Sequence, residues 1–179
     1  MTRRPIGAVA VVAVVLLATG GWFAARSLNR PSDPGCRVVA GTRTYHLDSQ
    51  QVANAVIITD AARESGLAHH AVTVAVAAAL QESQLRNLTH GDRDSLGLFQ
   101  QRPSQGWGTP AQILDPHFAA VAFFRALARI DRWQTMAVTE AAQLVQRSAT
   151  PTAYAGSEAE ARAIARATTG ELPGTLTCG

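Results

Sequence analysis

The sequence predicts an all-α domain, and three observations lead to that prediction. Apolar residues recur at helical spacing through most of the chain after residue 48. Two capping residues are each followed by a proline suited to the first helical position, in Thr109-Pro110 and Asp115-Pro116. The connections are short, and the sequence shows no internal repeat and no convincing sheet. A chain of 179 residues is long enough for one domain with a proper core.

The first 25 residues are predicted to be a membrane or export element. Residues 6–25 carry no charge and follow Arg3 and Arg4. As a helix they would span about 30 Å, the thickness of a bilayer core. A signal peptide cleaved near Ala18-Thr19-Gly20 is the other interpretation. Residues 1–25 are therefore expected to be either a single-pass anchor or a cleaved signal. The domain would be membrane-anchored in the first case and secreted in the second.

A short linker, residues 26–35, leads into the predicted domain of residues 36–179. Cys36 and Cys178 bracket this domain. A disulfide between them would fix both ends of the domain. In the chain-entropy model it would stabilise the folded state by roughly 4–5 kcal/mol. It would also imply an oxidising, extracytoplasmic compartment. Two unrelated free thiols are the alternative.

The basic character of the chain belongs to its N-terminal end. The calculated pI is about 9.5, but four of the 16 arginines lie at positions 3, 4, 26 and 30. Residues 31–179 hold 12 arginines against 13 acidic residues, a net charge of −1. A nucleic-acid partner is therefore not expected. The five histidines and two cysteines show no ligand spacing, so neither a metal nor another cofactor is expected.

The first half of the domain is predicted to contain two helices. Residues 36–47 give only weak signals for a brief extended segment. Asp48-Ser49 is a good N-cap for a helix that runs through Ala62 and closes at Gly66. The next helix, residues 68–85, is almost entirely apolar through its middle and is expected to be the central buried helix.

The second half is predicted to be a polar loop followed by four helices. The loop covers residues 86–108, is rich in glycine and aspartate, and has room for a short hairpin. The helices are expected to begin with the caps Thr109, Asp115, Thr139 and Ser157, and the last three to end near Ile130, Arg147 and Gly170.

Glu82 is the leading catalytic candidate. It lies near the end of the central apolar helix, on the same stripe as Val74, Ala78 and Leu85. The stripe beside it is polar, and a polar loop follows. A carboxylic acid between an apolar wall and a polar cleft retains its proton more readily, because burial disfavours the charged form. This setting predicts a general acid; a solvent-exposed glutamate at a helix end is the alternative.

The residues around Glu82 resemble a known family. Gln81-Glu82-Ser83 is followed by Ser95-Leu96-Gly97-Leu98-Phe99-Gln100-Gln101-Arg102-Pro103. This pattern resembles the soluble lytic transglycosylase branch of the lysozyme-like superfamily. In that branch a helix ends in Glu-Ser, and a loop leads to a Gly-Leu-Met-Gln segment and a proline. Ala153-Tyr154-Ala155-Gly156 is the best match to the family's third motif, although the asparagine usual after the tyrosine is absent.

The resemblance implies a lysozyme-like helical fold and assigns roles to four residues. Glu82 would be the catalytic acid, and Ser83, the serine beside it, would contact the substrate. Gln100 would line the glycan cleft, and Tyr154 would pack near the acid. A single glutamate suffices in this family, acting as acid and then as base.

Other residues of the loop are weaker candidates. Ser95 and Gln101 are expected to bind substrate through hydrogen bonds. Trp107, between two glycines, is predicted either to stack on a sugar ring or to cap the loop. Asp92 and Asp94 are the nearby candidates for a second carboxylate, although turn formation is the commoner role for such residues.

The sequence thus predicts a peptidoglycan-active protein, a lytic transglycosylase that cleaves the glycan strand. A non-catalytic module that binds or scaffolds the cell wall is the alternative. The expected partners are peptidoglycan glycan strands and, through the N-terminal helix, the membrane.

Overall fold

The computed structural model describes residues 35–147, 152–171 and 176–179. The predicted anchor or signal of residues 1–25 lies outside these ranges. Among the described residues, no helix combines the length and the apolar character needed to cross a membrane. By its contacts the chain separates into residues 1–33 and a compact unit of residues 34–179.

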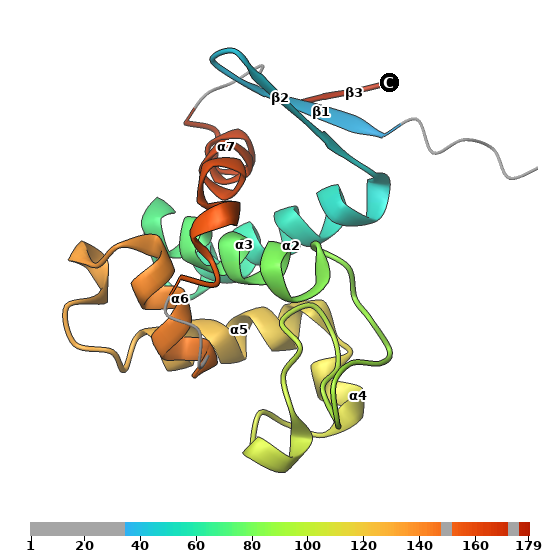
Figure 1. Cartoon of the computed structure of the whole chain (residues 1–179), viewed down its shortest axis with the longest axis vertical. Coiled ribbons are helices and arrows are strands. Elements are labelled where there is room, and N and C mark those ends of the chain that lie inside the picture. The colour runs from blue at the N-terminus through green and yellow to red at the C-terminus, as the bar shows by residue number, and fades with distance from the viewer. Residues whose placement is uncertain (1–34, 148–151, 172–175) are drawn as a thin grey trace, which may run out of the picture. The chain divides into compact units, whose positions relative to one another are not determined.

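The prediction of an all-α domain is wrong. The described part of the chain contains six α-helices and a three-stranded antiparallel sheet, so the fold is mixed (Figure 1). The strands are β1 (Cys36–Ala40), β2 (Arg43–Leu47) and β3 (Leu176–Cys178), in the order β2-β1-β3.

Strands β1 and β2 form within residues 36–47, where only weak signals for an extended segment are present. Gly41, at a φ of 61°, lies in the tight turn that joins β1 to β2. Glycine adopts this left-handed conformation without the steric cost that other residues have. In β1, Cys36 and Val38 are buried while Arg37 and Val39 are exposed, the alternation of a strand with one covered face. At three residues, β3 is too short to show such a pattern in the sequence.

The disulfide between Cys36 and Cys178 is confirmed. The two residues lie directly opposite each other in the β1–β3 register, with their Cα atoms 4.0 Å apart. The bond therefore ties the first strand to the last and closes a loop across a sequence separation of 142.

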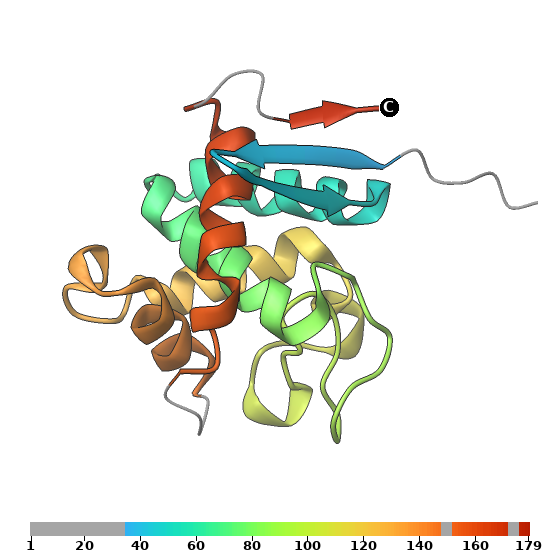
Figure 2. The same ribbon diagram turned by 45° about the horizontal axis from the view of Figure 1, so that its top comes forward.

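The helices surround a central buried helix, as expected. Residues 71–79 of α3 are all buried, and α3 packs against α2, α5, α6 and α7. The sheet lies at one end of the helices and the loop of residues 86–108 at the other (Figures 1 and 2). The helices are α2 (Ser49–Glu64), α3 (His69–Ser83), α4 (Pro110–Ile113), α5 (Pro116–Leu127), α6 (Val138–Gln146) and α7 (Glu158–Thr169), with 3₁₀ turns at Pro103–Gln105, Trp133–Thr135 and Ala155–Ser157.

Most predicted helix starts are confirmed. Asp48, Thr109 and Asp115 are N-caps whose side chains accept backbone hydrogen bonds. Thr139 as a cap is wrong, because α6 begins at Val138 and its N-cap is Ala137, two residues before Thr139. The Thr139 hydroxyl is buried and has no hydrogen-bond partner among the described residues.

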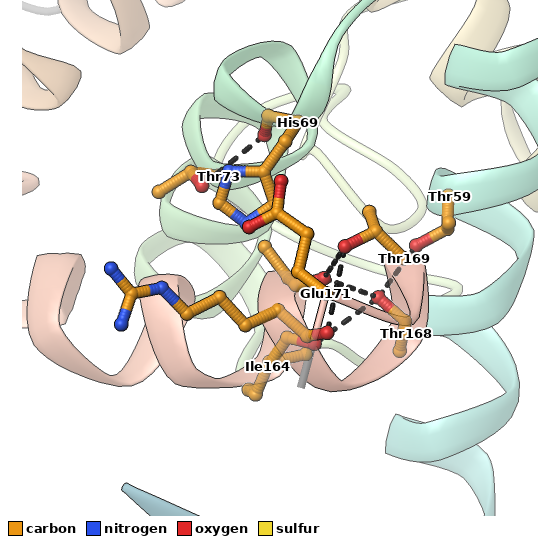
Figure 3. A network of polar contacts seen from close by, with 9 residues as sticks. Thr59, His69, Thr73, Ile164, Thr168, Thr169 and Glu171 are labelled. Atoms are coloured by element: carbon orange, nitrogen blue, oxygen red, sulfur yellow. Dashed lines mark hydrogen bonds and ion pairs between the residues drawn. The ribbon is translucent and has the colours of Figure 1, made fainter. Parts of the chain in front are cut away.

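The C-terminal end of α7 is tied to α2 and α3 (Figure 3). Thr59 donates a 2.7 Å hydrogen bond to the Thr168 hydroxyl. Glu171, just beyond α7, lies 3.6 Å from Nε2 of His69 in the first turn of α3. Burial lowers the pKa of His69 against the opposing effect of Glu171; Arg166, Arg162 and His70 lower it further.

Candidate active site around Glu82

Glu82 is the penultimate residue of α3 and is half-buried. Val74 and Ala78, on its stripe of the helix, are fully buried. The helix ends at the next residue, Ser83, because Gln84 and Leu85 both adopt left-handed backbone conformations, with φ of 55° and 59°. Each such residue other than glycine costs roughly 1–2 kcal/mol. Contacts from elsewhere must therefore stabilise the chain reversal behind Glu82.

Helix α2 provides these contacts. Gln51 Nε2 donates a 2.9 Å hydrogen bond to the Gln84 carbonyl oxygen. Asn54 Nδ2, which is buried, donates one of 2.7 Å to the Leu85 carbonyl oxygen. Arg86 forms an ion pair with Asp48, the N-cap of α2. Sequence reasoning missed this role of α2, although the spacing of three between Asp48, Gln51 and Asn54 puts them on one helical face.

Ser83 connects α3 to the loop. Its side chain is buried, and Oγ donates a 2.7 Å hydrogen bond to the Leu98 carbonyl oxygen. Ser83 Oγ also accepts a 3.2 Å hydrogen bond from the backbone N–H of Arg86. The Ser83 hydroxyl thus fixes the position of the Gly97-Leu98-Phe99 segment relative to Glu82. Its predicted contact with substrate stays a prediction.

Tyr154 reaches Glu82 from the other half of the domain. The two residues are 72 positions apart, yet the Tyr154 hydroxyl donates a 2.8 Å hydrogen bond to Glu82 Oε1. Tyr154 is only 1% exposed, so its ring is held by core packing. Within the described residues, Glu82 Oε2 has no hydrogen-bond partner. One carboxylate oxygen is therefore oriented by the protein, and the other is available to a ligand.

The two candidate second carboxylates lie in different settings. Asp94 accepts hydrogen bonds from Arg102 Nε at 2.6 Å and from the Ser104 backbone at 2.8 Å. Hydrogen bonds from Ser104, and then from Arg102, hold the pKa of the Asp94 carboxyl well below its usual range. The side chain of Asp92 is 92% exposed and lies 3.9 Å from Arg93. Asp94 is thus engaged in closing the loop, and Asp92 faces solvent.

The loop carries Gln100 in a strained conformation. Gln100 has a φ of 47°, and its Nε2 donates to the Gly97 carbonyl oxygen at 3.2 Å and the His90 carbonyl oxygen at 3.3 Å. Any side chain at position 91 would collide with the side chain of Gln100, because a Cβ on Gly91 would lie 1.8 Å from Gln100 Oε1. Isolated bridges Leu88–Gly97 and Leu96–Gln101 stand in place of the predicted short hairpin.

Gln101 and Ser95, predicted to bind substrate, are buried in the structure. Gln101 Nε2 donates a 3.2 Å hydrogen bond to the Ala119 carbonyl oxygen on α5. Its Oε1 has no partner among the described residues. Gln101 therefore anchors the loop to α5, and the substrate contacts predicted for both residues stay predictions.

Trp107 lies on the wall of a groove of about 600 Å³ between the loop, α5 and α6, and Glu82 is not among the residues that line this groove. It is half-buried and packs on the core.

No protein-family profile matches the chain, and no curated protein matches its sequence.

Proposed function

We propose that the chain cleaves the glycan strand of peptidoglycan as a lytic transglycosylase, with Glu82 as its single acid and base. The observation that best supports this proposal is the hydrogen bond from Tyr154 to Glu82 Oε1. It places a buried tyrosine on the acid, as the resemblance to the transglycosylase branch implies. It also leaves Oε2 available to a substrate oxygen.

The chemistry needs one carboxyl group that donates a proton and later accepts one. Protonated Glu82 donates its proton to the glycosidic oxygen as the bond from that oxygen to the sugar C1 breaks. The 6-hydroxyl of the same sugar then attacks C1, and its proton returns to Glu82. The products are a new 4-hydroxyl end and a 1,6-anhydro sugar end, so no water is consumed.

The loop carboxylates support a single-acid reaction over one with a second carboxylate. Both oxygens of Asp94 accept hydrogen bonds from the loop itself. Asp92 is almost fully exposed beside Arg93. A nucleophile or base opposite Glu82 would need a free carboxylate facing the same bond.

We place the reaction outside the cytoplasm. The Cys36–Cys178 disulfide supports this placement, because such bonds persist in oxidising compartments. A membrane anchor or cleaved signal in residues 1–25 would be consistent with it.

The test is digestion of purified peptidoglycan by the full-length chain, with products identified by mass spectrometry. We expect muropeptides that end in anhydro-muramic acid, and no products from E82Q. E140Q is the matched control, because Glu140 is an exposed glutamate in the first turn of α6. Reducing ends would show hydrolysis and contradict transglycosylation. Wall binding without products from the wild type would contradict enzymatic activity and support the alternative, a wall-binding module.

A further inference from the structure

The groove between α5 and α6 has the features of a binding site. It measures about 600 Å³ and is lined by the segment of residues 105–108, by α5 and the residues after it, and by the end of α6. Gly108 brings this segment close to α5, because a Cβ there would lie 2.9 Å from the Phe118 ring. The wall includes Leu144, one of three large apolar side chains exposed among the described residues.

Three exposed arginines line the groove: Arg125, Arg129 and Arg147. Arg125 lies in the last turn of α5 and Arg129 just beyond the end of the helix, so two like charges that repel each other line the same groove. No carboxylate among the described residues forms an ion pair with any of the three. This cluster contrasts with a domain whose net charge is about neutral. An anionic ligand would relieve the repulsion, and guanidinium groups bind carboxylates in a paired geometry.

The groove is linked structurally to the loop beside Glu82. Gln146, next to Arg147, donates a 2.9 Å hydrogen bond from Nε2 to the Phe99 carbonyl oxygen. The neighbouring Leu98 carbonyl oxygen accepts the hydrogen bond from Ser83. Two hydrogen bonds thus connect the groove wall to the residue next to the candidate acid.

We propose that this groove binds the acidic peptide stems carried by the glycan strand. The proposal rests on the function proposed above and specifies its substrate class: strands whose stems retain free carboxylates. The three arginines match those carboxylates. The apolar part of the wall, Ala122, Ala126, Ile130 and Val145, matches small apolar side chains of a peptide. A polyol phosphate polymer offers the charge but no apolar groups, so these residues favour the peptide.

The test measures binding of soluble muropeptides to the full-length chain by calorimetry. The probes are a disaccharide with a free-carboxylate stem, the same compound with its stem carboxylates amidated, and a glycerol phosphate oligomer. Binding is compared for the wild type, E82Q, R125Q/R129Q and R147Q. R43Q is the control, since Arg43 is an exposed arginine on β2, outside the groove.

We expect the free-carboxylate muropeptide to bind about tenfold more tightly than the amidated one. A difference of this size corresponds to the loss of one charge-assisted hydrogen bond. This preference should disappear in R125Q/R129Q, weaken in R147Q and remain in E82Q and R43Q. Equal affinity for both muropeptides, or a preference that survives in R125Q/R129Q, would overturn the proposal. Tighter, arginine-dependent binding of the phosphate oligomer would overturn it in favour of a phosphate polymer.

The two proposals fail in different ways. Carboxylate-dependent binding without cleavage would contradict the transglycosylase function and support the groove. Cleavage that is equally fast on free and amidated strands, with no preference in binding, would contradict the groove alone.

Discussion

Asn54 on α2 donates a buried hydrogen bond of 2.7 Å to the carbonyl oxygen of Leu85, three residues beyond Glu82. The bond stabilises a chain reversal in which Gln84 and Leu85 are both left-handed. Strain of this kind persists only where the surrounding structure fixes it, and it is common at functional sites. Helix α2, which holds none of the predicted site residues, thus helps to position the candidate acid.

The first prediction concerns this bond. N54A should lower the free energy of unfolding by about 1–3 kcal/mol, because the buried Leu85 carbonyl group loses its partner. Peptidoglycan cleavage should also fall under conditions where the variant is fully folded, because the end of α3 is no longer held. Urea unfolding and muropeptide release measure the two effects. Q50A, an exposed position on the same helix, is the control and should change neither. Unchanged cleavage by folded N54A would contradict a positioning role.

The second prediction concerns Tyr154. Y154F removes only the hydroxyl that donates to Glu82, so the core packing of the ring remains. A hydrogen bond to the negative charge that develops on Glu82 as its proton leaves contributes about 1.5–3 kcal/mol, so cleavage should fall about 10- to 100-fold. Y45F, a half-buried tyrosine on β2, should retain full activity. Wild-type rates in Y154F would show that the hydroxyl does not orient the acid.

The sequence predicted those parts of the fold and site whose signals are local. Asp48, Thr109 and Asp115 are recognisable as caps because a helix start needs only neighbouring residues. The end of α3 and the half-buried position of Glu82 follow from an apolar run that stops.

Features that depend on tertiary contacts were missed. Strand β3 has three residues and forms by pairing with β1, so its sequence alone has no strand pattern. The bonds from Gln51 and Asn54 to the residues after Glu82 span more than 30 positions. Only the family resemblance predicted that Tyr154 lies near Glu82, because periodicity cannot relate residues 72 positions apart.

The third prediction concerns the disulfide. C36S/C178S should lower the free energy of unfolding by roughly 4–5 kcal/mol, because the bond closes almost the whole described domain and restricts the unfolded chain. The wild type treated with reductant should unfold at the same denaturant concentration as this double variant. A difference between the two samples would show that the serine substitutions disturb the sheet independently of the bond.

The fourth prediction concerns the pH dependence of stability. Burial lowers the pKa of His69 below its usual 6.5 in the folded state. The unfolded chain therefore takes up a proton first as the pH falls. The contribution of His69 to the free energy of unfolding is complete above pH 6.5. It is lost as the pH falls from 6.5 through the pKa of His69 in the folded state. Urea unfolding at pH 7.5 and 5.5 should show a smaller loss of stability in H69Q than in the wild type. H46Q, at an exposed position on β2, should behave like the wild type. Equal pH dependence in H69Q and the wild type would contradict the assignment.

The fifth prediction separates loop closure from catalysis at Asp94. Hydrogen bonds from Ser104 and Arg102 lower the pKa of Asp94, so its stabilising effect is present above pH 3.8 and declines as the pH falls below that value. D94N should speed amide hydrogen exchange at Ser104, whose backbone donates to this carboxylate at 2.8 Å. D92N is the matched control, because Asp92 is exposed and two positions away. If a single acid carries the reaction, both variants retain peptidoglycan cleavage while E82Q loses it. A loss in D94N as complete as that in E82Q, with the loop still ordered, would instead make Asp94 a second catalytic carboxylate.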